Sequence, residues 1–350
     1  MKRLDKLRGF LLENNADGII VSSYPNIFYF SEFTSEDALL YITREKAYLI
    51  TDSRYTIQAK KEAKGYEVIV FKNGFLKELE KLIIKGSNIL FEESMTYARY
   101  NAYSSNLECN LVATNIDSLR NIKDEKEIKN IKKACDIASK TYDHIINFVK
   151  PGMKEKEVAN EMIHYMKSLG ATKESFETIV ASGKRGAMPH GTASNKVIRD
   201  GDFVTLDYGC IYNGYCSDIT RSFLVGNDNK EMIKIYNIVK KAQELAVKSV
   251  KAGVRASEVD KVARDYITSK GYGKYFTHST GHGLGIEVHD PISVSSRSDM
   301  VLEENMIITI EPGIYIKNLG GIRIEDDVLV TKDGYKILTK ASKRLIKITE

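Results

Sequence analysis

The pattern of apolar and polar positions changes near residue 120. Before this point, short apolar runs typical of strands lie at residues 18–23, 37–43, 46–52, 66–71 and 88–93. We expect the run NIFYFSEF (26–33) to be β-rich as well. Helical spacing of apolar residues alternates with these runs, at residues 4–14, 55–64 and 75–85. Strands that alternate with helices predict a small α/β domain over residues 1–120.

After residue 120 the periodic segments become longer. Asp124 and Glu127 have the spacing of a capping box and should open an amphipathic helix. Further helices are expected at residues 154–169, 229–251 and 256–270, and strand pairs at residues 202–225 and 305–331. Asn213-Gly214 marks a hairpin turn inside the first pair. The order of helices, strand pair, helices and strand pair predicts an α+β domain over residues 121–350 with two similar halves.

Composition excludes several classes of protein. The 350 residues are 43% hydrophobic and 28% charged, which is ordinary for globular domains. The net charge of +5 is spread along the chain without the concentrated basic patch of a nucleic-acid surface. No apolar stretch approaches the length of a membrane span. The four cysteines have no CxxC spacing, so we expect reduced thiols and a cytoplasmic location.

Carboxylates recur on the strands of the second domain. By strand parity, each of four strands places one carboxylate away from its more apolar face. These residues are Asp207, Asp218, Glu311 and Glu325. Four carboxylates on the inner face of one sheet would repel one another unless a cation lay among them. A single acidic residue in a strand usually faces solvent, and this is our interpretation of Asp326 and Asp327, with a supporting role as the alternative.

The segment HSTGHGLGIEVHDP (278–291) holds His278, His282 and His289, three of the six histidines in the chain. Its glycines would let the backbone pass close to a neighbouring group, because glycine has no Cβ. A lone histidine beside glycines is more often a packed polar residue than a metal ligand. The joint occurrence of these histidines and the four carboxylates in one strand-rich region favours a site for divalent cations.

Five segments in this order resemble the pita-bread metallopeptidases, in particular the Xaa-Pro branch that contains aminopeptidase P and prolidase. They are MPHGTASNK, LDYGCIYNGYCSDITRSF, HSTGHGLGIEVHD, ITIEPGIYI and GGIRIEDDVLVT. The N-terminal SYPNIFYFSEF and TDSRY and the helix start KDEKEIKNIKKA also resemble this branch. The resemblance implies a creatinase/prolidase-type N-terminal domain and a pita-bread catalytic domain with pseudo-twofold halves.

The resemblance also implies the roles of individual residues. Two divalent cations would be held by Asp207, Asp218, His282, Glu311 and Glu325. Glu311 would act as general base and then acid for a hydroxide shared by the two cations. Catalytic or substrate-side imidazoles would be His190, His278 and His289, the last stabilising an oxyanion together with His190. Arg323 would orient carboxylates or hold substrate, and Tyr315 would line the pocket.

The cofactor and substrate follow from the same resemblance. Carboxylate-rich ligation with one imidazole suits hard or borderline ions, so we expect Mn²⁺, with Co²⁺, Zn²⁺ and Fe²⁺ as alternatives. The substrates would be proline-containing peptides cleaved at the Xaa-Pro imide bond, and members of the family are commonly homodimers.

Three alternatives stay open. A creatinase-like enzyme or a binding module would share the fold without peptidase activity, and an aminopeptidase of other specificity would share the metal site. Within the Xaa-Pro branch, dipeptidase and aminopeptidase activities are both compatible with the sequence. Prolidases often carry an arginine directly after the histidine-proline stretch, whereas Ile292 follows Pro291 here, leaving Arg297 as the nearest substitute for holding a substrate carboxylate.

Overall fold

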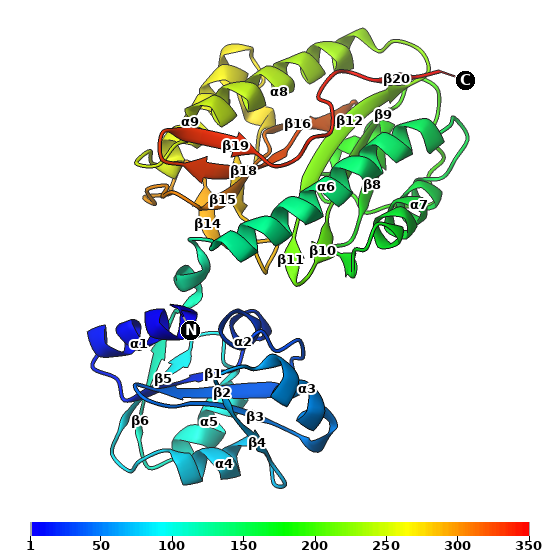
Figure 1. Cartoon of the computed structure of the whole chain (residues 1–350). Coiled ribbons are helices and arrows are strands. Elements are labelled where there is room, and N and C mark those ends of the chain that lie inside the picture. Colours follow the sequence, from blue (N-terminus) through cyan, green and yellow to red (C-terminus); the bar gives the residue numbers. More distant parts are fainter. Residues whose placement is uncertain (1, 350) are drawn as a thin grey trace. The chain divides into compact units, whose positions relative to one another are not determined.

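A computed structural model describes residues 2–349 and divides the chain into two compact units, Met1–Arg120 and Asn121–Glu350 (Figure 1). Each unit combines helices with strands, and the expected fold class, a small α/β unit followed by an α+β unit, is confirmed. No helix between residues 2 and 349 has the length and apolar character needed to cross a bilayer.

The first unit is built on a six-stranded mixed sheet in the order β4-β3-β2-β1-β5-β6. Its strands are β1 Gly18–Val21, β2 Ala38–Thr43, β3 Ala47–Thr51, β4 Glu67–Val70, β5 Asn88–Glu92 and β6 Asn110–Thr114. Its helices are α1 Lys2–Glu13, α2 Tyr24–Ser31, α3 Thr56–Glu62, α4 Phe75–Leu82 and α5 Tyr97–Asn106, with short 3-10 turns η1 Ser53–Tyr55 and η2 Asp117–Arg120. The central β1 pairs antiparallel with β2 and parallel with β5.

The expectation of a β-rich run at residues 26–33 is wrong, because this segment forms most of helix α2 (Tyr24–Ser31). Pro25 occupies the first turn of the helix, where its fixed φ angle fits and no amide hydrogen is needed. The residues from Asn26 to Ser31 are all buried. A helix buried on every side shows no amphipathic period, so an apolar run of this length cannot be told from a buried strand.

The second unit has four long helices, α6 Glu125–Phe148, α7 Glu155–Ser168, α8 Lys230–Ser249 and α9 Ala256–Ser269. The expected capping box is present at the start of α6. The Asp124 side chain accepts from the Glu127 amide at 2.9 Å, and the Glu127 carboxylate accepts from the Asp124 amide at 2.9 Å. Such a cap stabilises a helix by about 1 kcal/mol.

The described strands of the second unit form two larger sheets, which are antiparallel except where β20 pairs in parallel with β12, and two small antiparallel ones. The first half contains β7 Lys173–Glu174, β8 Ile179–Ser182, β9 Phe203–Tyr208, β10 Cys210–Tyr212, β11 Tyr215–Cys216 and β12 Ile219–Val225, with the 3-10 turn η3 Gly183–Ala187. The second contains η4 Gly273–Tyr275, β13 Gly281–Gly283, β14 Asp290–Val294, β15 Ile307–Ile310, β16 Gly313–Ile316, β17 Gly320–Arg323, β18 Asp326–Thr331 and β19 Gly334–Ile337. The last strand, β20 Lys347–Ile348, returns to pair with β12.

Two apolar cores reflect the two expected halves. One core packs α6 and α7 against β8, β9 and β12, and the other packs α8 and α9 against β15, β17 and β18 (Figure 1). The predicted hairpin joins β10 to β11, with positive φ angles at Asn213 and Gly214 as a type I′ turn requires.

The four carboxylates do not share the face of one sheet, which corrects that expectation. Only Asp207 lies within a strand, β9. Asp218 lies between β11 and β12, Glu311 directly follows β15, and Glu325 lies between β17 and β18. The expected strands that hold Asp218, Glu311 and Glu325 are each interrupted at or directly beside the carboxylate, and the strands on either side belong to different sheets. The carboxylates therefore meet where sheets of both halves come together.

Candidate metal centre

The second unit contains a cavity of about 380 Å³ that brings most of the predicted site residues together. Both halves of the unit contribute to its wall. The lining residues are Phe176, Glu177, Ile179, Pro189, His190, Thr192, Asp207, Asp218, His278, Ser279, His282, Val288, His289, Glu311, Arg323 and Glu325. All five predicted metal ligands and all three predicted catalytic imidazoles are among them.

Asp218, His282 and Glu325 form the tightest group in the cavity. One potential ligand atom from each lies within 4.8 Å of the others. Asp218 and Glu325 are only 4% and 1% exposed, yet Asp218 Oδ1 and Glu325 Oε1 receive no hydrogen bond from any described residue. A buried carboxylate oxygen without a donor is costly. Two such oxygens beside an imidazole indicate a place for a cation.

Hydrogen bonds hold the side chain of Glu325 and the backbone of Asp218 in place. Thr220 Oγ1 donates to Glu325 Oε2 at 2.7 Å. This bond fixes the carboxylate and leaves Oε1 without a hydrogen-bond donor. The amide of Asp218 donates to Asp327 Oδ2 at 3.0 Å, which fixes the backbone of that residue. Groups that orient a ligand in this way are a regular feature of metal sites.

The ring of His282 is oriented by its own strand. Its Nδ1 lies 3.0 Å from the carbonyl oxygen of Gly283, which can only accept, so Nδ1 carries the hydrogen. The other nitrogen, Nε2, lies 3.2 Å from Glu311 Oε1 and 3.6 Å from Asp218 Oδ2. At Gly281 a Cβ would collide with the carbonyl oxygen of Thr309. Glycine at this position therefore allows β13 to pass close to the neighbouring strand, as the sequence predicts.

Asp207 and Glu311 complete the set of five, with different partners. The Arg323 guanidinium contacts Asp207 Oδ2. Glu311 Oε1 accepts from the Thr309 hydroxyl at 3.3 Å, and the same hydroxyl accepts from the amide of His282 at 3.1 Å. The structure thus ties Glu311 to His282 through a shared threonine.

Charge is unevenly balanced among these groups. Burial, followed by the neighbouring carboxylates, raises the pKa of Asp218 and of Glu325 well above their usual range. Burial also acts on Glu311, but the hydrogen bond and charge of His282 dominate and lower its pKa to about 2. Burial alone would lower the pKa of His282, and contact with Glu311 raises it instead. Positive charge placed among these carboxylates would allow all of them to ionise.

The donor set fits divalent cations. It consists of four carboxylates and one imidazole, the combination used by hard and borderline metal ions. Asp218 and Glu325 each have one oxygen that no described residue satisfies, and both residues belong to the same tight group as the His282 imidazole. A cation bound by this group would offer these oxygens a partner.

The predicted substrate-side residues surround this set. Tyr315 lies just behind the cavity wall, where its hydroxyl contacts His278 Nε2 at 2.9 Å and accepts from Arg323 at 2.7 Å. The ring of His289 meets that of His282 edge to face, with centroids 4.3 Å apart. Burial, and then the charge of His282, lower the pKa of His289. His190 is exposed on the cavity rim.

Two expectations about charged residues need revision. Arg297 is exposed on the turn after β14 and does not line the cavity, so no contact in this chain supports it as a substrate group. Asp326 and Asp327 are fully buried rather than on the surface. Glu177 and Phe176, which line the cavity, were not predicted, because a single acidic or aromatic residue in a loop carries no pattern.

Arg323 is engaged by the protein on every nitrogen. Its Nε donates to Thr220 Oγ1 at 3.1 Å, one terminal nitrogen donates to Tyr315 and to the Pro189 carbonyl, and the other contacts Asp207. Of the two roles considered from the sequence, orienting a carboxylate matches these contacts.

Comparison with known proteins points to one family. Residues 129–332 match metallopeptidase family M24, and residues 3–122 match the Creatinase/Prolidase N-terminal domain. The chain is 42% identical over 351 residues to the Xaa-Pro dipeptidase of Pyrococcus horikoshii, and the alignment covers 99% of each protein. It resembles the solved structure of an Xaa-Pro dipeptidase from Bacillus anthracis with a TM-score of 0.97, at 44% identity over 99% of both chains. An X-Pro aminopeptidase from Thermotoga maritima matches with a TM-score of 0.91, at 38% identity over 99% of both chains.

The family match spans more than half of the chain and includes every residue of the Asp218, His282 and Glu325 group. Family membership accounts for the mixture of carboxylates and imidazole in the cavity, since metallopeptidases hold divalent ions. The chain belongs to metallopeptidase family M24, and the Creatinase/Prolidase N-terminal domain precedes its peptidase domain in the sequence.

Proposed function

We propose that this peptidase hydrolyses the Xaa-Pro bond, either in dipeptides or at the N-terminus of longer peptides. The observation that carries the proposal is the convergence of two unsatisfied carboxylate oxygens and one imidazole in the cavity of an M24 chain. The names of its relatives, Xaa-Pro dipeptidase and X-Pro aminopeptidase, support proline in the position after the scissile bond.

In this proposal Asp207, Asp218, His282, Glu311 and Glu325 hold two divalent cations. Mn²⁺ is our first choice because four of the five ligands are hard carboxylates, with Co²⁺, Zn²⁺ and Fe²⁺ as alternatives. When bound, such a pair of cations would polarise the scissile carbonyl and lower the pKa of a water molecule, so that this water could attack as hydroxide.

The residues of the chain then supply proton transfer and positioning. Glu311 lines the cavity with its Oε1 3.2 Å from His282 Nε2, a contact that lowers its pKa and keeps it ionised, and in this proposal it accepts the proton of the attacking water. Glu311 then passes this proton to the nitrogen of the cleaved bond, which leaves as the secondary amine of proline. His289 and His190 lie on the cavity wall and would donate to the oxyanion. Tyr315 and His278 brace Arg323, which orients Asp207.

The proposal also covers the domain boundary, the cellular compartment and the oligomeric state of the enzyme. We place the domain boundary between residues 120 and 121, with catalysis in residues 121–350, since all cavity residues fall between 176 and 325. The four cysteines form no disulfide, which is compatible with the cytoplasm. We expect a homodimer by analogy with the family. Sedimentation of the purified protein would test this state.

The substrate test compares hydrolysis of Ala-Pro and Ala-Pro-Ala in Mn²⁺ buffer. Cleavage of the dipeptide alone would indicate a dipeptidase, and comparable or faster cleavage of the tripeptide would indicate an aminopeptidase. Cleavage of neither by the metal-loaded protein would overturn the assignment. Glu311→Gln should remove the activity by removing the base. Glu304→Gln serves as the matched control, because it makes the same substitution at an exposed glutamate that does not line the cavity, and it should leave the rates unchanged.

A further inference from the structure

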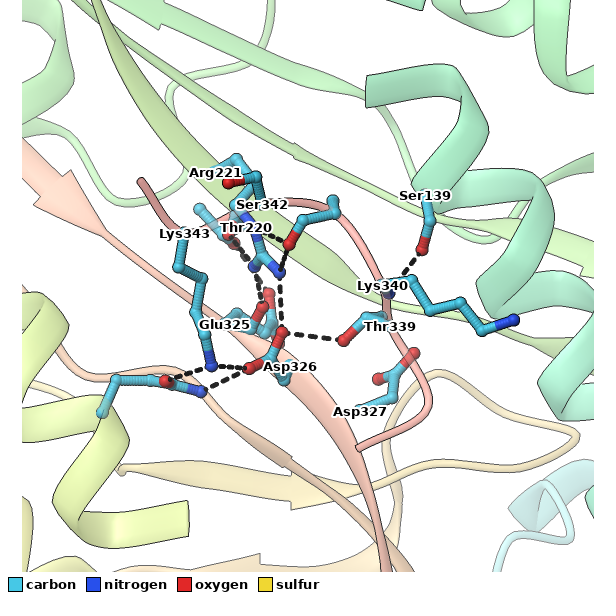
Figure 2. Close-up of polar contacts among 12 residues, drawn as sticks. Ser139, Thr220, Arg221, Glu325, Asp326, Asp327, Thr339, Lys340, Ser342 and Lys343 are labelled. Carbon is cyan, nitrogen blue, oxygen red and sulfur yellow. Dashed lines mark hydrogen bonds and ion pairs between the residues drawn. The ribbon is translucent and has the colours of Figure 1, made fainter. Parts of the chain in front are cut away.

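Next to the cavity lies a second group of buried charges that the proposed reaction does not use. Asp326, directly after Glu325, is 0% exposed and forms its centre (Figure 2). We call it the Asp326 cluster, and it consists of Asp326, Arg221, Gln243, Thr339 and Lys343. Its members come from β18, β12, α8 and the segment after β19.

Every acceptor position of Asp326 is occupied by a protein donor. Oδ1 accepts from Arg221 at 2.7 Å and from the Thr339 hydroxyl at 2.8 Å. Oδ2 accepts from Gln243 Nε2 at 2.9 Å and contacts the ammonium of Lys343. Lys343 also donates to Gln243 Oε1 at 3.0 Å, so the two donors to Oδ2 fix each other.

Arg221 connects this cluster to Glu325. Besides Asp326, its guanidinium contacts the carbonyl oxygen of Glu325 and donates to the carbonyl oxygen of Thr220 at 2.9 Å. The same Thr220 carbonyl accepts from the amide of Glu325 at 3.1 Å. The backbone of Glu325 is thereby held on both sides, and the Thr220 hydroxyl holds one oxygen of its carboxylate.

The last part of the chain closes the arrangement. Arg221 donates to the carbonyl oxygen of Ala341 at 2.8 Å, and Thr339 and Lys343 reach Asp326 from the same segment. Figure 2 shows these groups converging on Asp326, whereas the side chain of Lys340 extends away from it. The side chain of Lys343 is 19% exposed and that of Lys340 is 76% exposed.

We propose that Asp326, Arg221 and Lys343 position Glu325, so that Lys343 in the C-terminal segment helps to set the geometry of the metal centre from outside the cavity. The inference rests on the proposed role of Glu325 as a metal ligand. Buried ion clusters are often no more stable than apolar packing of the same volume, but they fix geometry because each donor and acceptor must meet. Mutation of a residue that holds a ligand in place commonly costs about 10–100-fold in metal affinity or activity.

The test compares Lys343→Met with Lys340→Met, which remove a partly buried and an exposed ammonium three residues apart. Each protein is stripped with a chelator, checked for native circular dichroism at 25 °C, and titrated with Mn²⁺ alone by calorimetry. We expect Lys343→Met to bind Mn²⁺ at least about 10-fold more weakly, and Lys340→Met to match the unchanged protein. At limiting Mn²⁺, kcat on Ala-Pro-Ala should fall while KM stays the same, and Lys343→Arg should restore most of the affinity.

A folded Lys343→Met protein with unchanged Mn²⁺ affinity and unchanged kcat would overturn the proposal, even if its thermal midpoint fell. If Lys343→Met does not fold, Thr339→Val decides, because it removes only one hydrogen bond to Asp326 and preserves the shape of the side chain. Weaker Mn²⁺ binding by that variant supports the positioning role, and unchanged binding contradicts it. The calorimetric result does not depend on the peptide substrate, so a wrong Xaa-Pro assignment would not affect it.

Discussion

Glu325 and Asp326 are consecutive buried carboxylates, and their negative charges are balanced in opposite ways. Asp326 is surrounded by Arg221, Lys343, Gln243 and Thr339, and each of its oxygens has two protein donors. Glu325 lies next to it in the chain, yet its Oε1 has no donor among residues 2–349. The cavity is lined by four further carboxylates, and Arg323 is the only lysine or arginine among its lining residues.

This difference separates structural from functional carboxylates. Where the protein supplies the cations itself, the carboxylate is ionised, fully hydrogen-bonded and fixed. Where the protein supplies too few cations, as around Asp218 and Glu325, the carboxylates have raised pKa values and one oxygen each without a donor, which is the environment that an external cation completes. Burial alone would not distinguish the two groups, since Asp326 and Glu325 are 0% and 1% exposed.

The largest effect should come from the cavity itself. His282→Ala removes the only imidazole of the Asp218, His282 and Glu325 group. We expect loss of bound metal after dialysis, measured by elemental analysis, and a fall in peptide hydrolysis greater than the roughly 10–100-fold typical of residues that only support ligands. A fully metallated and active His282→Ala protein would show that the cavity carboxylates are balanced by something other than a cation.

The next effect should come from the Asp326 cluster and concern stability. Arg221→Met removes a cation that is 1% exposed and leaves Asp326 with one cation in place of two. Removing one partner of a buried ion pair costs about 3–5 kcal/mol, because the remaining charge stays desolvated. Urea unfolding followed by circular dichroism should show this loss, whereas Lys340→Met should change stability by less than about 0.5 kcal/mol. Equal midpoints for the two variants would remove the distinction between the cluster and an ordinary surface pair.

The smallest effect concerns pH and the metal-free protein obtained by chelation. Burial raises the pKa of Asp327 to about 7, and burial with neighbouring carboxylates raises those of Asp218 and Glu325. These groups bind more protons folded than unfolded, so their stabilising contribution is complete below about pH 4 and is lost as pH rises through the folded pKa values. The thermal midpoint of the metal-free protein should therefore fall from pH 5 to pH 8, by about 2–4 °C per kcal/mol lost.

Asp326 should not contribute to this pH dependence. Burial by itself raises its pKa, but Arg221 and then Lys343 lower it, so it stays ionised at both pH values and adds nothing to the change. Adding Mn²⁺ should remove most of the fall, because a cation replaces the protons on the cavity carboxylates. A metal-free midpoint that is equal at pH 5 and pH 8 would contradict the raised pKa values on which the comparison rests.

Several features could be predicted from local pattern. The capping box of Asp124 and Glu127 and the turn at Asn213-Gly214 depend on a few adjacent residues, and both form as expected. The segment 26–33 could not be predicted, since a helix buried on all sides and a buried strand are the same apolar run until packing decides between them.

For the cavity, too, some features follow from the sequence and others only from the tertiary structure. The sequence by itself determined which residue types were present, their order and their resemblance to one peptidase family, because ligand chemistry belongs to the side chains. Only the tertiary structure decided that Glu325 faces the cavity while Asp326 and Asp327 are buried behind it, and that Arg297 does not line the cavity. Charge balance around a carboxylate depends on donors far apart in the chain, such as Arg221 and Lys343, and no local pattern records which of them will meet.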